Sequence, residues 1–218
     1  EFNTYQLSSV LKRYDEWWRY GAYSYLVSGG EQSTILLIWR YVTHDYGYLA
    51  KRGIKSQLYN LDGDSLTVRN AFAVMPEGSA SQYYPQAAFL DNGGAAISWE
   101  DHRDKRNYYL RAFDSDFSPR SGSKKIVDFD GSFTHLHDHT LTANSVGDIA
   151  VTSYRCGGNP GNVMFQLYDS NCERAGGNTF VSATSCITSV PALNGNGDMA
   201  LLWGFDRMYV KFYNASGD

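Results

Sequence analysis

The sequence lacks a long hydrophobic run, an excess of charge of one sign and any complete catalytic or cofactor-binding motif. Its longest apolar stretch, residues 35–39, has the length of a strand and not the ~18–20 residues that cross a bilayer. Lys and Arg total 19 against 23 Asp and Glu, and neither sign forms a long run. A polyanion-binding surface needs such an excess of positive charge. We therefore expect a protein that neither inserts into a membrane nor binds nucleic acid.

Cysteine is also scarce, with Cys156, Cys172 and Cys186 as the only three. Three thiols allow one disulfide and leave one over, which favours an oxidising compartment and a secreted or cell-surface location. The N-terminus does not read as a signal peptide. Residue 1 is then either a mature terminus or an artificial boundary, and Glu1-Phe2 could be a cloning remnant.

Aromatic residues are abundant, at 15% of the chain, and favour pleated sheets over helices. Four short apolar runs end at residues 39, 99, 153 and 203, and a Gly-rich or Asn-rich turn precedes each one. A second strand with an aromatic near its end follows each run, at residues 59, 113, 168 and 213. Two landmarks that recur in step indicate an internal repeat of about fifty residues.

Each repeat reads as a four-stranded antiparallel meander, and meanders repeated at this spacing are typical of β-propeller blades. We predict an all-β propeller of four blades, over residues 22–76, 77–131, 132–182 and 183–218, with residues 1–21 as an entry segment. The fourth repeat stops where its last strand should begin, so we expect residues 2–10 to pair near residues 208–213 and close the ring. The alternatives are part of a longer propeller, a sandwich or a solenoid.

The pattern Pro-x-x-Ala-x-Leu-x-x-Gly-Gly-x-x-x-x-Trp, seen over residues 85–99 with the strand end at 166–169, resembles repeats of secreted and cell-surface bacterial β-propellers. The resemblance covers residues 22–218, although Ser153 replaces the Trp and the first repeat lacks the Pro. It implies export and a role in adhesion, scaffolding or partner binding. It implies no catalytic residues.

In a meander propeller the two longer kinds of connection emerge at one end of the blades, where function concentrates. The candidate binding residues assigned to these loops are Trp17, Trp18, Asp45, Tyr84, Glu100, Asp101 and Asp206. Aromatic rings stack on sugar faces and carboxylates accept hydrogen bonds from hydroxyl groups, so this composition suits a glycan or a protein partner. In the alternative interpretation, Trp17 and Trp18 pack in the core, and the carboxylates are solvent-exposed loop charges.

Three histidines alternate at His135, His137 and His139, so on an extended strand they would share one face and could hold a divalent metal. Ordinary polar residues entering an inner strand are the alternative, and no other cofactor is indicated. We also predict a Cys156–Cys186 disulfide, because both residues fall in loops at the same end, with Cys172 free at the other end.

The sequence therefore favours a secreted or surface-exposed, non-enzymatic module that binds a glycan or protein. One alternative is a glycoside-directed hydrolase that uses the loop carboxylates as paired acids. Another is a structural subunit of a larger surface assembly. Fold analogy alone does not choose between them.

Overall fold

The computed structural model describes residues 24–29, 34–43, 51–62, 65–74, 82–101, 107–126, 136–155, 162–176, 179–182, 188–204 and 207–218. All regular structure in these residues is β, so the expected all-β fold is confirmed for them. They contain no helix long and apolar enough to cross a membrane.

The strands form four separate antiparallel sheets, each a meander in chain order. The first sheet contains β1 (Ser24–Gly29), β2 (Thr34–Thr43), β3 (Lys51–Asp62) and β4 (Ser65–Ala73). The second contains β5 (Gln82–Phe89), β6 (Ala95–Asp101), β7 (Asn107–Phe113) and β8 (Lys124–Lys125). The third contains β9 (Leu136–Ala143), β10 (Ile149–Arg155), β11 (Asn162–Tyr168) and β12 (Thr179–Ser182). The fourth has three described strands: β13 (Thr188–Leu193), β14 (Met199–Gly204) and β15 (Met208–Tyr213).

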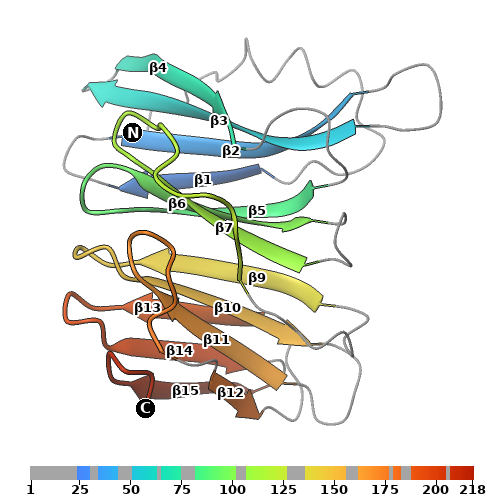
Figure 1. Cartoon of the computed structure of the whole chain (residues 1–218), viewed down its shortest axis with the longest axis vertical. Helices are drawn as coiled ribbons and strands as arrows, with labels where there is room; N and C mark the ends of the chain where they lie inside the picture. The colour runs from blue at the N-terminus through green and yellow to red at the C-terminus, as the bar shows by residue number, and fades with distance from the viewer. Residues whose placement is uncertain are drawn as a thin grey trace.

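The sheets follow one another in a stack, from the first at the top of Figure 1 to the fourth at the bottom. The leading strands of neighbouring sheets contact each other, β1 with β5, β5 with β9 and β9 with β13. Such an arrangement, with the first strand of each sheet innermost, is that of successive propeller blades. The predicted closing strand, residues 2–10, lies outside the described residues, so closure of the ring stays a prediction.

Five-residue turns of one geometry join many of the strands at one end of the stack, on the left of Figure 1. In the turn from Asn194 to Asp198, the first amide donates to the fifth carbonyl and the fourth amide donates to the first carbonyl. The fourth residue has a positive φ, which Gly197 adopts without a steric penalty. Phe117 and Cys172 hold the same position with φ of 63°, and both side chains are buried. Their burial between sheets offsets the strain of the left-handed backbone.

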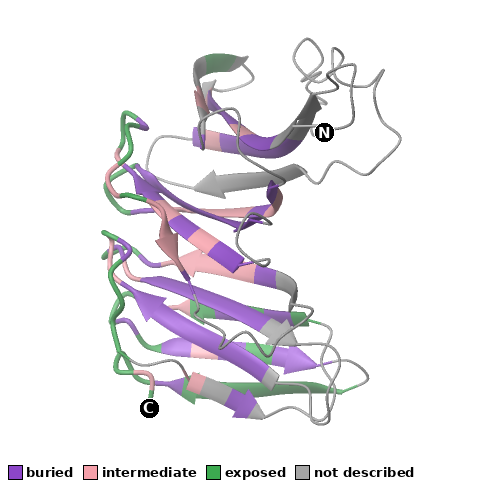
Figure 2. Cartoon of the chain, turned by 45° about the vertical axis from the view of Figure 1, so that its right-hand side comes forward, coloured by how far each residue is buried: buried purple, intermediate pink, exposed green. Residues whose placement is uncertain are grey.

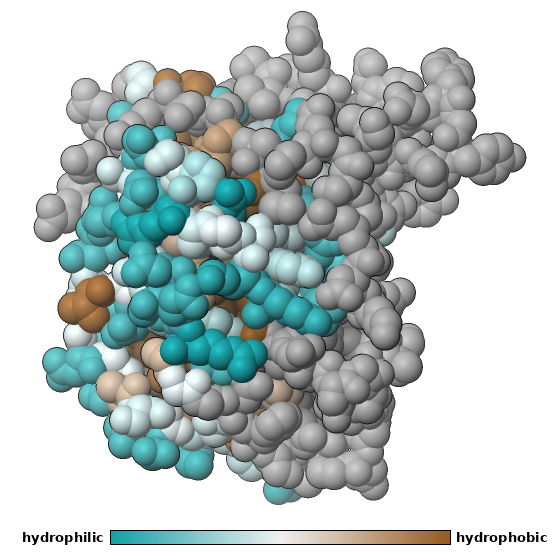
Figure 3. Space-filling view, in the orientation of Figure 1, coloured by the Kyte–Doolittle hydropathy of each residue, from teal (hydrophilic) through white to brown (hydrophobic). Residues whose placement is uncertain are grey.

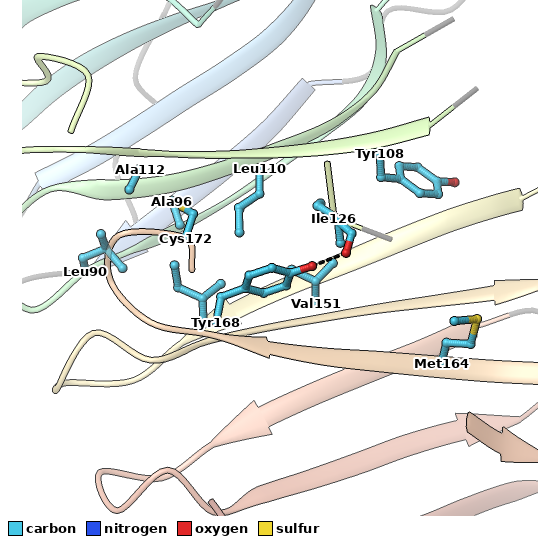
Figure 4. Close-up of a cluster of buried hydrophobic side chains, with 11 residues drawn as sticks. Leu90, Ala96, Tyr108, Leu110, Ala112, Ile126, Val151, Met164, Tyr168 and Cys172 are labelled. Carbon is cyan, nitrogen blue, oxygen red and sulfur yellow. Dashed lines mark hydrogen bonds between the residues drawn. The ribbon is translucent and has the colours of Figure 1, made fainter. Parts of the chain in front are cut away.

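Apolar side chains from facing sheets form the core. Figure 4 shows the cluster between the second and third sheets, where Leu110 and Ala112 meet Val151, Tyr168 and Cys172. The Tyr168 hydroxyl donates to the carbonyl of Ile126, which links the two sheets, and burial raises the pKa of that phenol. Cys172, the fourth residue of the turn from Asp169 to Glu173, also lies in this cluster. Its thiol is free, and burial raises its pKa to about 11.

Candidate functional site

The end of the second sheet opposite the short turns gathers hydrogen-bonding side chains. The strand register sets Gln82 opposite Asp101, and Asp101 opposite Asn107. In the next row Tyr83 lies opposite Glu100, which lies opposite Tyr108. Because directly opposed residues of antiparallel strands have neighbouring side chains, the register assembles amides, carboxylates and phenols from three strand ends. We call Gln82, Tyr83, Tyr84, Glu100, Asp101 and Asn107 the polar strand end.

The two carboxylates of this group do not lie in an exposed loop, as the sequence analysis assumed. Glu100 and Asp101 are the last residues of β6, and both are buried. The interpretation was wrong because it ended the strand at Trp99, whereas the pairing with β5 and β7 continues through Asp101. Tyr84, also assigned to a loop, lies within β5. The carboxylates are thus held by the sheet rather than by a solvated connection.

Tyr84 lies at an irregularity in β5. The register shifts between Tyr83 and Gln86, and Tyr84 has a φ of 48°. Bulges of this kind redirect a side chain and often occur next to binding sites. The rings of Tyr83 and Tyr84 lie 6.1 Å apart, and the Arg40 guanidinium lies 4.9 Å from the centre of the Tyr83 ring. Aromatic surface and a cation from the first sheet therefore adjoin the carboxylates.

Gln82 is the most unusual member of the polar strand end. Its side chain is 1% exposed, and neither its Nε2 nor its Oε1 has a hydrogen-bond partner. A buried amide without partners costs about 1–3 kcal/mol for each unsatisfied group. Sequence reasoning missed Gln82, because an isolated Gln carries no motif and its burial depends on the packing of strands.

His139 occupies the contact between the second and third sheets. Its Nε2 lies 2.8 Å from the Ser98 hydroxyl, and its ring lies 4.4 Å from the ring of Tyr108. Complete burial lowers the pKa of His139 to about 3, so the imidazole is neutral at physiological pH. Its Nδ1 is buried without a partner. The ring is therefore a structural link between sheets.

The metal hypothesis rests on residues that are only partly described. His135 lies outside the described residues, and for His137 only the backbone is described, opposite Tyr154. The part of the chain that the structure describes holds no group of three or more His, Cys, Asp or Glu side chains suited to a metal ion. A site built on all three histidines stays a prediction.

Six further predicted residues also lie outside the described residues: Trp17, Trp18, Asp45, Asp206, Cys156 and Cys186. For the hydrolase hypothesis, this leaves Glu100 and Asp101 as the described candidate acids. Successive residues of a strand point to opposite faces, so these two carboxyl groups cannot flank one glycosidic bond. Any acid pair would need a partner from the undescribed connections.

The described surface in the view of Figure 3 is mostly hydrophilic, with isolated hydrophobic residues. The chemistry that the polar strand end can perform is recognition of hydroxyl, amide or carboxylate groups, through charged, amide and phenolic side chains.

No protein-family model matches the chain, and no curated protein matches it. Among solved structures it is similar to a mutant of NanB sialidase from Streptococcus pneumoniae, with 12% identity and a TM-score of 0.51. The match covers 83% of this chain but 28% of the sialidase chain. A GH43 endo-arabinanase from Bacillus licheniformis matches at 12% identity and a TM-score of 0.44, over 89% of this chain and 74% of its own. The sialidase similarity supports a propeller-type fold and leaves the activity open.

Proposed function

We propose that this protein is a binding module that recognises a hydroxyl-rich ligand, a glycan, at the polar strand end of its second sheet. The observation that carries the proposal is the buried amide of Gln82, with no partner on either of its polar atoms. A sugar hydroxyl both donates and accepts hydrogen bonds, so a pair of adjacent hydroxyls would satisfy both atoms at once.

The neighbouring groups suit the same ligand. Tyr84 lies at the bulge with its ring near that of Tyr83, and aromatic rings at such positions stack on the apolar faces of sugars. Asp101, which lies opposite Gln82 in the strand register, supplies an acceptor for a further hydroxyl. Because Glu100 and Asp101 point to opposite faces of the sheet, the arrangement favours binding over hydrolysis. We further propose that the module acts outside the cell, where such ligands occur.

The test uses the substitution Gln82→Leu, with the affinity of the chain measured on neutral and acidic oligosaccharides by calorimetry. Removing an unsatisfied amide should raise the free energy of unfolding by about 1–3 kcal/mol. In the same variant, glycan affinity should fall at least ~10-fold, since one hydrogen-bonded group is worth about 1.4 kcal/mol. A gain in stability together with a loss of binding distinguishes a ligand site from a packing defect.

Gln86→Leu is the matched control, because Gln86 lies on the same strand and is only partly buried. It should leave affinity unchanged. Tyr84→Ala should weaken binding by about 1–3 kcal/mol if the ring is an anchor. Release of sugar by the wild type, abolished in Glu100→Gln, would instead establish the hydrolase. Failure to bind any glycan would overturn the proposal and leave a protein ligand or a structural role in a surface assembly.

A further inference from the structure

Trp99 carries a second buried polar atom that has no hydrogen-bond partner. Its side chain is fully buried, and among the described residues nothing bonds to its Nε1. Trp99 packs in the core cluster that contains Ile38 of the first sheet, so it lies on the face of β6 toward that sheet. Asp101 follows two residues later on β6, and alternate residues of a strand share a face. The side chains of Trp99 and Asp101 therefore lie on the same face.

Gln82 lies within reach of Trp99 on this face. It is paired directly with Asp101, and directly opposed residues of antiparallel strands have side chains on the same side of the sheet. Across β5 and β6, Trp99 is then the diagonal neighbour of Gln82. Diagonal neighbours lie about 7–8 Å apart, a separation that aromatic and long side chains can span. The register therefore brings the amide of Gln82 and the indole of Trp99 into one neighbourhood.

The two side chains are complementary, yet they are not bonded to each other. An indole N–H only donates, whereas the amide oxygen of Gln82 accepts. Neither Nε1 of Trp99 nor either polar atom of Gln82 has a partner in the described chain. Trp39, at the matching place in the first repeat, also has an unpaired Nε1, but it packs in a separate cluster of the first sheet. An unpaired indole is therefore not enough to mark a site, and the adjoining amide is the second observation.

Building on the glycan-binding function proposed above, we propose that one ligand hydroxyl bridges the two side chains. It accepts a hydrogen bond from Nε1 of Trp99 and donates one to Oε1 of Gln82. A free hydroxyl does both at once, whereas ether and carboxylate oxygens cannot donate and an ammonium group cannot accept. Nε2 of Gln82 then donates to a neighbouring hydroxyl. Trp99 is thus a specificity-determining residue that selects a sugar with two adjacent free hydroxyls at this position.

Both groups lie where β5 begins and β6 ends, with the half-buried Tyr83 and Tyr84 next to Gln82 in the chain. Figure 2 shows buried residues along the strands of the second sheet, whereas exposed residues gather at the short turns. A ligand thus reaches Gln82 and Trp99 only when the side chains over them move. Association should then be slower than about 10⁵ M⁻¹s⁻¹, since a required conformational change lowers the rate.

The first measurement is NMR of the full chain with ¹⁵N-labelled tryptophan, which has five indole N–H groups, one for each Trp. The signals of Trp99 and Trp203 are assigned by their loss in Trp99→Phe and Trp203→Phe. The probes are the methyl glycosides of glucose, galactose and mannose. We expect the Trp99 signal to shift as a bound glycoside saturates the protein, because its N–H gains an acceptor. The Trp203 signal should stay in place.

The second measurement is affinity by calorimetry. Trp99→Phe keeps a ring beside Tyr109 but loses the N–H, and should weaken binding about 10-fold. Trp203→Phe is the matched control, because Trp203 stacks on Tyr209 with ring centres 5.9 Å apart, as Trp99 does on Tyr109 at 6.1 Å. It should bind like the wild type. In the double variant with Gln82→Leu, the loss should be smaller than the product of the two single losses, since both side chains act on one hydroxyl.

Monodeoxy derivatives of the bound glycoside locate the bridging hydroxyl. Removing that hydroxyl should abolish the Trp99 shift and lower affinity together, whereas removing a hydroxyl remote from the bridge should leave the shift intact. If Trp99→Phe fails to fold by circular dichroism, the Trp99 signal is assigned in the wild type through its contacts with Tyr109. The titration and the monodeoxy series then decide.

The possible failures separate the bridge from the proposed function. Binding that is lost in Gln82→Leu but unchanged in Trp99→Phe, with a Trp99 signal that does not move, would overturn the bridge and leave glycan binding standing. A wild type that binds none of the three glycosides would also overturn the bridge. If it binds no oligosaccharide either, the proposed function falls with it.

Discussion

Two contacts between neighbouring sheets use the same strand position with opposite chemistry. Between the first and second sheets the position is Ile38, buried among apolar residues that include Trp99 and Phe113. Between the second and third sheets it is Ser98, bonded to His139. The comparison shows that the fold does not require one particular kind of residue at this position. It requires that the residue and its partner on the next sheet match, either both apolar or both able to hydrogen-bond.

The third sheet supports the same conclusion. There the position is Thr152, whose hydroxyl lies 3.0 Å from that of Ser189 on the fourth sheet and 2.7 Å from that of Thr140. The Thr152–Ser189 contact is buried, as is the Ser98–His139 contact, and buried hydroxyls are tolerated only when hydrogen-bonded. Exchanging the chemistry of one contact without its partner should therefore be costly.

The largest expected effect comes from placing the polar residue in the apolar contact. Ile38→Ser should lower the free energy of unfolding by about 3–4 kcal/mol, because it removes buried methyl groups and leaves a hydroxyl among hydrocarbon. Equilibrium unfolding in urea measures the change. The control Ile38→Val should cost about 1 kcal/mol. Equal losses for Ser and Val would show that the contact does not discriminate against a hydroxyl.

The second prediction concerns the pH dependence that His139 brings to the polar contact. Its pKa is about 3 in the folded chain against 6.5 when unfolded, so only the unfolded chain takes up a proton as pH falls below 6.5. The stabilisation is fully present above pH 6.5 and declines toward pH 3, by up to ~1.4 kcal/mol per pH unit. Between pH 6.5 and 4.5 this amounts to about 2 kcal/mol, because the slope reaches its full value only below the unfolded pKa.

The variant His139→Gln isolates this contribution, since Gln can still bond to Ser98 but does not titrate in this range. Urea unfolding at several pH values should show the wild type losing stability relative to the variant as pH falls. Parallel curves for the two proteins would mean that His139 is protonated in the folded state, in contradiction to its burial.

The sequence could predict the turns and the strand pairing within each repeat, because both depend on residues that are close together in the chain. Turns such as Asn194–Asp198 follow from the residues themselves, since Asn caps the turn through its side chain and Gly takes the positive φ. Strand pairing within each repeat follows from alternation and turn length. The sequence did not reveal that Phe117 and Cys172 take the glycine position of their turns, because that depends on how their side chains pack between sheets.

The candidate site was predicted less well for a related reason. Glu100 and Asp101 look like loop residues, and only the register with β5 and β7 extends the strand to include them. The bond between Ser98 and His139 joins residues 41 positions apart on different sheets. No short pattern encodes such a contact, because it depends on how two sheets are placed against each other.

The smallest expected effect concerns the second polar contact, which has no ionisable group. Thr152→Val replaces the hydroxyl with a methyl of similar size, so it removes the bonds to Ser189 and Thr140 without leaving a cavity. We expect a loss of about 1 kcal/mol in the free energy of unfolding, the net worth of an ordinary hydrogen bond together with partners left unsatisfied. Thr152→Ser keeps the hydroxyl and should retain the bonds, with a smaller loss from the missing methyl. The free energy of Thr152→Val should also stay parallel to the wild type from pH 7 to 5, since neither hydroxyl titrates there. If Thr152→Val were as stable as the wild type, the polar contact could be exchanged for an apolar one on a single side, and complementarity across the sheets would not be required at this position.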